Sequence, residues 1–350
     1  MRGPHHASGG RNRSGDAMDV IRVTPRGYCY GVVDTMEIAR KAAKDAATPR
    51  PIYIVGLIVH NRIAVEELTS LGIITLDGPD RASILEQVRE GTVIFTAHGV
   101  SPDVQTRARE RGLHVIDATC PDVTKTHDLV RAWVAQGYKI LYIGKKGHPE
   151  PEGVIGEAPD AIFLVETEGD LDHLPPAFAQ AERLAVTTQT TLSQWDTRHL
   201  IEVIRERFPR VLVQSEICRA TQDRQEAVAR MAQGADLTIV VGDPRSNNTN
   251  RLVQVAEEIA GSHAVRVESL ADLKPEWLAG KRRIAVTSGA STPSRITREV
   301  IQFVERFGQS QQDAPKSQEH PHTEVFPLPL AGPAANTGTD GDTPPAPARD

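Results

Sequence analysis

The stretch that decides the fold is His114-Val115-Ile116-Asp117-Ala118-Thr119-Cys120-Pro121, a β-branched run followed by one cysteine and then by a predicted helix. The same order occurs twice more: mostly apolar residues 20–23 precede Cys29, and apolar residues 211–213 precede Cys218. These are the only cysteines in the chain, separated by 91 (120 − 29) and 98 (218 − 120) residues. The sequence therefore predicts three similar units, each with one thiol between a strand and a helix.

The three cysteines suit a shared soft-metal site. A cysteine at a helix N-terminus has its thiolate favoured by the helix dipole and by free backbone N–H groups. A buried free cysteine often acts as a small hydrophobic residue, but three at equivalent places of a repeat are harder to explain in that way, and an odd number argues against a disulfide framework. Zinc sites usually have tighter local spacing, whereas iron–sulfur clusters accept scattered thiolates. We interpret Cys29, Cys120 and Cys218 as ligands of one metal cluster with a fourth coordination position open.

Each cysteine is followed by the same succession of elements. Predicted helices cover about 32–46, 123–136 and 222–233; the next strands cover 52–55, 139–143 and 237–241; and the last strands cover 92–96, 184–187 and 284–287. Short strands alternating with longer helices are typical of parallel α/β units. We predict an α/β protein of three similar lobes with small, mostly parallel sheets in a pseudo-threefold arrangement around a central cavity.

The predicted lobes are 29–112, 113–209 and 210–308, with a strand in 18–28 that completes the sheet of the third lobe. Residues 1–17 and the Pro- and Ala-rich residues 309–350 show no apolar periodicity. Such composition is typical of disorder. We therefore expect one folded core between two disordered ends.

Composition excludes several classes of function. The 350 residues are 39% hydrophobic and carry a net charge of -6, which gives no reason to expect nucleic acid as a partner. No run approaches the roughly 18 apolar residues of a membrane span, and residues 1–17 contain no apolar segment of a secretory signal. Unpaired thiols favour a reducing compartment, so we expect a cytoplasmic protein without a membrane partner.

Short hydrogen-bond donors follow the predicted strands. His60, His98 and His148 close equivalent loops in the first two units, and the third unit offers Ser246, Asn248 and Ser291. Ligands of parallel sheets bind at the carboxyl ends of the strands, and imidazoles, hydroxyls and helix N-termini are what a phosphate-type anion needs. There is no Walker A sequence and no convincing Gly-x-Gly-x-x-Gly, so a nucleotide is not indicated.

These motifs together carry a family resemblance. The chain resembles the 4-hydroxy-3-methylbut-2-enyl diphosphate reductases, which catalyse the last step of the non-mevalonate isoprenoid pathway. The resemblance covers about residues 20–307 and rests on segments 27–31, 59–61, 97–100, 117–121, 147–150, 188–193 and 289–291, which read GYCYG, VHN, AHGV, DATCP, GHPE, TQTTLS and GAS.

The resemblance implies a three-lobed fold around a 4Fe-4S cluster held by Cys29, Cys120 and Cys218, with the fourth iron free for the substrate hydroxyl. It implies loss of that hydroxyl as water, with two electrons from reduced ferredoxin or flavodoxin and two protons, to give isopentenyl and dimethylallyl diphosphates. The site residues it implies are diphosphate ligands, a residue near the substrate alcohol (Thr190) and a proton donor (Glu150); the ligands are His60, His98, His148, Ser246, Asn247, Asn248 and Ser291. Asn247 stands where the family has a second serine, which puts that contact in doubt.

The residues agree with this chemistry. Expelling hydroxide from an allylic carbon needs a Lewis acid on its oxygen and a nearby acid. Glu150, two residues from His148 in a predicted Pro-rigid turn, suits the acid, with His148 as the alternative donor. Pro149-Glu150 could instead open a helix, with Glu150 as an N-terminal carboxylate. Glu152 and Glu157 are better candidates for that structural role.

Two other classes of function fit part of the pattern. One is an electron-transfer iron–sulfur protein, which would need a fourth protein ligand and no anion donors. The other is a zinc-dependent hydrolase with a cysteine-rich site. Metal analysis of anaerobically purified protein separates them from a reductase: about four irons and four sulfides per chain against about one zinc.

If the three cysteines act as one unit, changing Cys29, Cys120 or Cys218 singly to Ser should abolish the visible iron–sulfur absorption and the activity. The measurement is the absorption spectrum and iron content of anaerobically reconstituted protein. Normal iron content and turnover in any one of the three variants would contradict the assignment.

Overall fold

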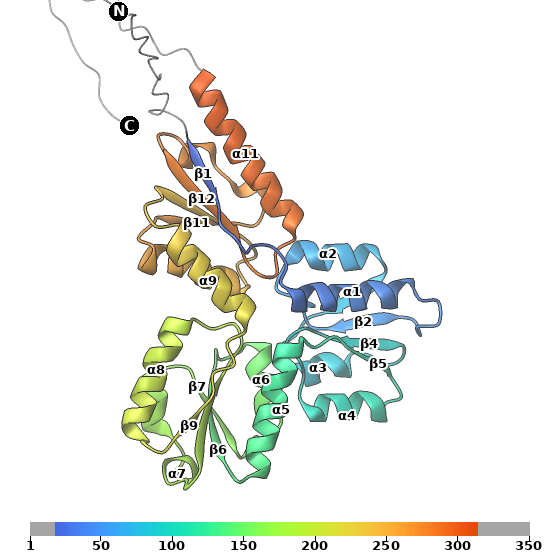
Figure 1. Cartoon of the computed structure of the whole chain (residues 1–350). Helices are drawn as coiled ribbons and strands as arrows, with labels where there is room; N and C mark the ends of the chain where they lie inside the picture. The colour runs from blue at the N-terminus through green and yellow to red at the C-terminus, as the bar shows by residue number, and fades with distance from the viewer. Residues whose placement is uncertain (1–17, 314–350) are drawn as a thin grey trace, which may run out of the picture. The chain divides into compact units, whose positions relative to one another are not determined.

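The computed structural model describes residues 18–313, which contain three four-stranded sheets with helices beside them (Figure 1). The first lobe consists of α1 (Tyr30–Lys44), β2 (Ile52–Val55), α2 (Arg62–Ser70), β3 (Ile73–Leu76), α3 (Arg81–Glu86), β4 (Thr92–Phe95), α4 (Pro102–Glu110) and β5 (His114–Asp117). The second consists of α5 (Pro121–Ala135), β6 (Lys139–Ile143), α6 (Pro149–Ile155), β7 (Ile162–Val165), η1 (Glu168–His173), α7 (Pro176–Ala179), β8 (Leu184–Thr188), α8 (Gln194–Arg207) and β9 (Leu212–Val213).

The third lobe takes strands from both ends of the described chain. It consists of β1 (Asp19–Arg22), α9 (Arg219–Met231), β10 (Leu237–Val241), α10 (Asn247–Gln254), η2 (Val255–Ile259), β11 (Ala264–Val267), η3 (Leu270–Asp272), η4 (Pro275–Trp277), β12 (Arg283–Ser288) and α11 (Ser294–Asp313). No helix among residues 18–313 is both long enough and apolar enough to cross a lipid bilayer.

The three sheets have the same strand order, and every pairing in them is parallel. Written from the same edge, the orders are β1-β12-β10-β11, β5-β4-β2-β3 and β9-β8-β6-β7. The predicted α/β lobes with small parallel sheets are therefore confirmed. Because β1 pairs with β12 from Asp19↔Arg283 to Arg22↔Val286, the strand within 18–28 lies in the third sheet, as predicted.

The predicted lobe boundaries at 113 and 210 are wrong. Strand β5 pairs with β4 of the first sheet, and β9 pairs with β8 of the second. The strand before each cysteine thus completes the preceding sheet, and the chain crosses to the next lobe only at the cysteine. The prediction recognised this arrangement for β1 alone. It assigned the strands before Cys120 and Cys218 to the lobes that follow them, because each strand is close in sequence to the helix after its cysteine.

Each sheet has an apolar core on both faces. In the first lobe, Ile54 packs with residues of α1 and α2 such as Met36, while Phe95 packs with residues of α3 and α4. Figure 1 shows these helix pairs on opposite sides of the sheet. The second and third lobes repeat the arrangement. Burial on both faces explains why the strands read as continuous apolar runs.

Most predicted elements are present with shifted ends. The first helix of each unit begins two or three residues earlier than predicted, at Tyr30, Pro121 and Arg219, directly after the cysteine. Helix α11 continues to Asp313, so residues 309–313 are helical although the tail was predicted to begin at 309. The predicted disorder of residues 1–17 and of the remaining tail lies outside the described residues.

Candidate active site

The three cysteines are the N-cap residues of α1, α5 and α9, and none of their side chains makes a capping hydrogen bond. Each backbone N–H instead donates to a carbonyl of a loop that follows a strand of the preceding lobe. The three bonds are equivalent: Cys29 to Ala290 at 3.0 Å, Cys120 to Ala97 at 3.1 Å and Cys218 to Thr190 at 3.0 Å. The geometry brings all three partly exposed thiols to one cavity.

The sequence predicted that helix N-termini favour the thiolate form of the cysteines, but burial favours the neutral thiol. It raises the pKa of Cys218 to about 11 and also raises the pKa of Cys120, and these effects outweigh backbone N–H groups at the start of α5 and α9. Helix N-termini alone therefore do not hold these thiols as thiolates. A bound metal cation deprotonates its thiol ligands outright, so the thiols are suited to ligation once a metal is bound.

Glycine at position 31 leaves room for the Cys120 thiol. A Cβ added at Gly31 would lie 2.4 Å from Cys120 Sγ. The first turn of α1 therefore approaches the second cysteine as closely as a bare backbone allows. A side chain at position 31 would therefore displace the Cys120 thiol from its place in the cavity.

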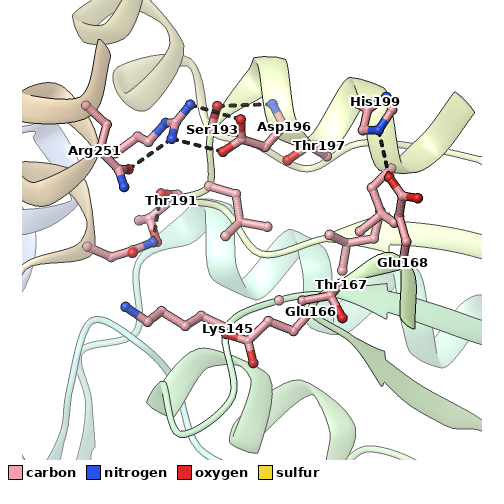
Figure 2. A pocket seen from close by; sticks show the side chains of 16 residues that line it. Lys145, Glu166, Thr167, Glu168, Thr191, Ser193, Asp196, Thr197, His199 and Arg251 are labelled. Carbon is pink, nitrogen blue, oxygen red and sulfur yellow. Dashed lines mark hydrogen bonds and ion pairs between the residues drawn. The ribbon is translucent and has the colours of Figure 1, made fainter. Parts of the chain in front are cut away.

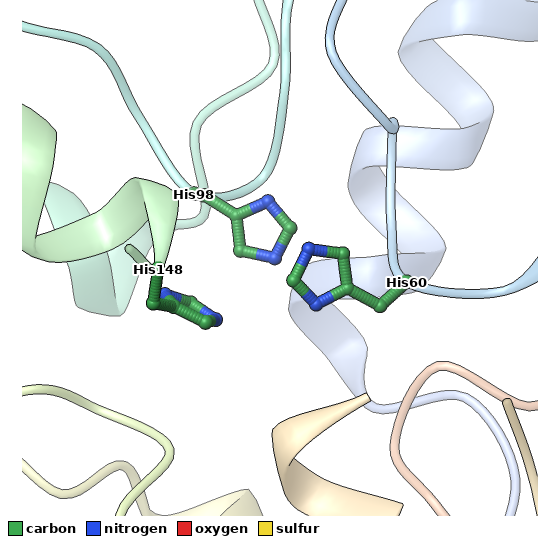
Figure 3. Close-up of side chains that lie close together, drawn as sticks. All are labelled: His60, His98 and His148. Carbon is green, nitrogen blue, oxygen red and sulfur yellow. The ribbon is translucent and has the colours of Figure 1, made fainter. Parts of the chain in front are cut away.

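Three imidazoles meet at another part of the same cavity (Figure 3). The ring centroids of His60, His98 and His148 lie 4.5 to 5.3 Å apart, and their ring nitrogens could hold a metal ion. Burial lowers the pKa of His60 to about 4 and that of His148 to about 3, and it lowers the pKa of His98 well below its ordinary value. At neutral pH the cluster is therefore uncharged and offers N–H donors.

The tautomer of His148 follows from its position as the N-cap of α6. Its Nδ1 accepts a hydrogen bond from the Glu150 backbone N–H at 3.2 Å. The proton of the neutral ring must then be on Nε2. His148 therefore has an Nε2–H donor available beyond the capping bond.

Glu150 is 1% exposed and faces Thr190. Its Oε1 accepts from the Thr190 backbone N–H at 2.7 Å, and its Oε2 accepts from the Thr190 hydroxyl at 3.0 Å. The Tyr142 hydroxyl donates weakly to Oε1 at 3.5 Å. Burial outweighs these bonds and raises the pKa of Glu150 to about 7. The carboxyl is thus poised to give or accept a proton near neutral pH.

The loops of the third lobe place Ser246 and Ser291 beside the histidines. The Ser291 hydroxyl lies 3.0 Å from the His60 carbonyl and 3.3 Å from the Ser246 hydroxyl. The Asn248 amide donates to Thr221, whose hydroxyl in turn accepts from the Cys218 thiol at 3.1 Å. These contacts connect the predicted anion donors to the predicted metal ligand of the third lobe.

Asn247 points elsewhere. Its side-chain amide donates to the Thr191 carbonyl at 3.0 Å, across the boundary between the third and second lobes. The same nitrogen lies 3.3 Å from the Thr191 hydroxyl, so both of its N–H groups have partners on Thr191. Asn247 lines the cavity, and its contact with the diphosphate stays a prediction.

All the predicted site residues line one cavity. Its lining includes Cys29, Cys120, Cys218, His60, His98, His148, Glu150, Thr190, Ser246, Asn247, Asn248 and Ser291. Helices α2, α6, α8 and α10 begin directly after loops that reach it, with Asn61, His148, Ser193 and Ser246 as N-caps. Helix N-termini favour anions, so the cavity joins a thiol site to an anion site.

A wider pocket opens beside the cavity, between the second and third lobes (Figure 2). It shares Thr191 and Asn247 with the cavity. Arg251 of α10 crosses this pocket to form a 2.9 Å ion pair with Asp196 of α8. Thr191 and Asn247 therefore separate the pocket from the central cavity.

Two features were not found from the sequence. The segment at Pro149 is the start of helix α6 and not a turn, so Glu150 occupies the helical position that was considered the alternative. Its carboxylate nevertheless bonds to Thr190 across the cavity. Tyr142 and Thr221, which contact the site, also went unnoticed, because a tyrosine in an apolar strand and a threonine in a helix carry no local signal.

The fold and the cavity define a class: a three-lobed α/β protein that brings three thiols to an anion site. The chain belongs to the LytB protein family, whose family model matches residues 20–305. Similar curated proteins carry the name 4-hydroxy-3-methylbut-2-enyl diphosphate reductase. The protein of Symbiobacterium thermophilum is 61% identical over 290 residues, 83% of this chain and 98% of that protein. That of Bacillus subtilis is 59% identical over 83% of this chain and 91% of its own length.

Solved structures agree. The E-1-hydroxy-2-methyl-but-2-enyl-4-diphosphate reductase from Plasmodium falciparum has a TM-score of 0.76 at 34% identity, covering 82% of this chain and 88% of that one. A second structure, described as the terminal enzyme of the non-mevalonate pathway, has a TM-score of 0.60 at 32% identity and covers 83% of this chain and 99% of its own. The predicted family is confirmed.

The buried Glu150 predicts a pH dependence of stability. Its pKa is raised from 4.5 to about 7 by folding, so the folded chain keeps a proton that the unfolded chain loses between these values. The resulting stability is fully present below about pH 4.5 and is lost as pH rises through about 7, by about 3 kcal/mol in total. Glu150→Gln should remove this loss.

The measurement is urea unfolding of both proteins between about pH 5 and 7.5, at equal metal content. As pH rises, the free energy of unfolding should fall more in the wild-type protein than in Glu150→Gln, because only the wild type ionises this carboxyl. The histidines titrate in both proteins, so their contribution cancels in the difference. Glu110→Gln, at an exposed position of α4, is the control. A difference that does not change with pH would contradict the assignment.

Proposed function

We propose that this chain reduces 4-hydroxy-3-methylbut-2-enyl diphosphate to isopentenyl and dimethylallyl diphosphates, at a 4Fe-4S cluster ligated by Cys29, Cys120 and Cys218. The observation that carries the proposal is the meeting of three thiols, a set of anion donors and one buried carboxyl in a single cavity. Electron transfer alone needs no anion donors. Hydrolysis needs no set of three thiols.

The thiol site supports the cluster. Membership of this family implies an iron–sulfur cluster. The three thiols are free, come from three helix N-termini and make no capping bonds. When bound, the cluster supplies electrons and Lewis acidity to the substrate alcohol. Three protein ligands leave one position of a four-iron cluster without a protein ligand.

The anion donors support the diphosphate. The Nε2–H of His148, the rings of His60 and His98, and the Ser246 hydroxyl line the cavity. Ser291 also lines it, and its hydroxyl, which donates to the His60 carbonyl at 3.0 Å, would turn to the diphosphate on binding. Neutral imidazoles donate hydrogen bonds to phosphate oxygens without carrying charge. Asn248 holds the Ala290 N–H through its carbonyl at 3.1 Å and so fixes the loop that carries Ser291.

Glu150 and Thr190 support the proton step. With the diphosphate at the imidazoles, the allylic alcohol can extend past Thr190 toward the thiols. The C–O bond breaks, the oxygen leaves as water with one proton from Glu150, and two electrons and a second proton complete a new C–H bond. Because its pKa is about 7, a large fraction of Glu150 carries a proton at neutral pH, which is the range in which general acids work best.

The electron donor that we propose is reduced ferredoxin or flavodoxin, since the reaction consumes two electrons and the chain offers no nucleotide-binding motif for a pyridine cofactor. We place the reaction in the cytoplasm, because free thiols that ligate a cluster require reducing conditions.

One observation favours a second function. The nitrogens of His60, His98 and His148 lie close enough to hold one metal ion, and three histidines are a known set of ligands for catalytic zinc. A zinc hydrolase, however, leaves the three thiols without a role. About four irons per chain after anaerobic purification would support the reductase, and about one zinc with no iron would support the hydrolase.

Glu150→Gln tests the proton step. The variant keeps the shape and can still hydrogen-bond, but it has no acidic proton, so turnover should fall by about 10² to 10⁴ while substrate binding changes little. His60→Ala or Ser291→Ala should instead weaken binding, by about 1 to 3 kcal/mol for each lost contact. The measurements are single-turnover product formation and separate dissociation constants on cluster-loaded protein. Near-normal turnover of Glu150→Gln would remove Glu150 from the proton path and leave His148 or a water as the donor.

Gly31→Ala tests the thiol site. Its added Cβ would come within 2.4 Å of Cys120 Sγ, so the thiol must move, and iron content after reconstitution should fall severalfold while the fold is retained. Gly169→Ala is the matched control, because a Cβ there would meet no atom closer than 3.7 Å. Full iron content in Gly31→Ala would show that Cys120 Sγ does not need its present position.

A further inference from the structure

We infer that Arg81, a residue outside the cavity lining, supplies the fixed positive charge of the diphosphate site. This inference rests on the proposed function. The three imidazoles at the site are neutral, yet a diphosphate carries two or more negative charges at neutral pH. Enclosing such an anion without a nearby cation would be costly.

Arg81 is held in place by both neighbouring segments of the site. It is the first residue of α3, after the N-cap Asp80, and its backbone N–H donates to Glu152 Oε1 at 2.8 Å. Glu152 lies in α6, the helix that His148 caps. The Arg81 guanidinium lies against Gly56, where an added Cβ would be 1.7 Å from its Nη1. Gly56 follows β2 directly, in the loop that ends at His60.

The Arg81 guanidinium is buried without a counter-ion. The residue is 6% exposed, and its Nε has no hydrogen-bond partner. Among residues 18–313 no carboxylate forms an ion pair with this guanidinium; Glu152 and Asp77 act on it only at longer range. A buried cation without a partner is destabilising. Such a charge is most simply explained by an anion that binds near it.

The charge of Arg81 reaches all three imidazoles. Burial is the largest cause of the lowered pKa of all three rings; the charge of Arg81 is the next cause at His60 and follows the neighbouring histidines at His98 and His148. No other arginine or lysine acts on all three rings. The same positive charge would attract an anion that is bound at these rings. Arg81 acts through space on the bound diphosphate and is a positioning residue, because it does not line the cavity.

The role predicts a loss of diphosphate affinity in a variant without this charge. Burial is the main reason that the pKa values of the three imidazoles are low, so the rings stay neutral when Arg81 is replaced by Met and cannot supply the missing charge. A variant that keeps a cation at this position should retain the affinity.

The experiment measures the dissociation constant of inorganic pyrophosphate by calorimetry on cluster-loaded R81M and wild-type protein at about pH 8. We expect the ratio of the two constants to be about 10 or more, with turnover at saturating substrate changed less than about twofold. R81K, which keeps the charge, should stay within about threefold of wild type.

R111M is the matched control. Arg111 also contacts the α3 region, where its guanidinium donates to the Leu85 and Val88 carbonyls, but it exerts no charge effect on the three imidazoles. Its ratio to wild type should stay near 1, even if thermal unfolding shows a loss of stability. If R81M does not yield folded protein, R81Q is measured in its place.

Two results would overturn the inference: a ratio near 1 for R81M, or an equal loss of affinity in R81K. The second would mean that Arg81 acts by its shape and not by its charge. A wild-type chain that neither binds pyrophosphate nor turns over substrate would overturn the proposed function as well. Normal wild-type binding that R81M leaves unchanged would overturn this inference alone.

Discussion

The structure depends on three backbone hydrogen bonds, in which the N–H of each cysteine donates to a loop carbonyl of the preceding lobe. The same cysteine is the N-cap of the first helix of the next lobe, so each cysteine joins two consecutive lobes. Because the bond uses the backbone and not the side chain, the thiol remains available. Side-chain contacts add further ties between lobes, such as Ser291 with the His60 carbonyl and the Arg81 N–H with Glu152.

Burial gives the cavity its chemistry. Removing water disfavours the charged form of every ionisable group, so it raises the pKa of the Glu150 carboxyl and of the Cys218 thiol while it lowers the pKa of the imidazoles. One environment thus yields a protonated acid, protonated thiols and neutral donors. The thiols can lose their protons to a bound metal cation, and the neutral imidazoles can donate N–H hydrogen bonds to an anion.

Much of this was predictable from the sequence, because short strands buried on both faces read as apolar runs and because their polar ends lie at one edge. The cysteines, the histidines and Glu150 were found in this way, and all line the cavity. The sequence did not predict that β5 and β9 belong to the preceding sheets, because the pairing of strands leaves no trace in the local sequence pattern. Arg81 was also missed, because a basic residue after Asp80 at a helix start looks like an ordinary surface position, and only the packing against Gly56 buries it.

The pairing of β1 with β12 has a consequence for biosynthesis. Asp19 pairs with Arg283, which is 264 (283 − 19) residues later in the chain, so the third sheet lacks one edge until almost the whole core has left the ribosome. The Cys29 N–H likewise finds its partner only when Ala290 has been made. Chains emerge at about 5–20 residues per second. The first thiol therefore waits many seconds for its neighbours, and a cofactor held by all three can be inserted only after translation of the core is complete.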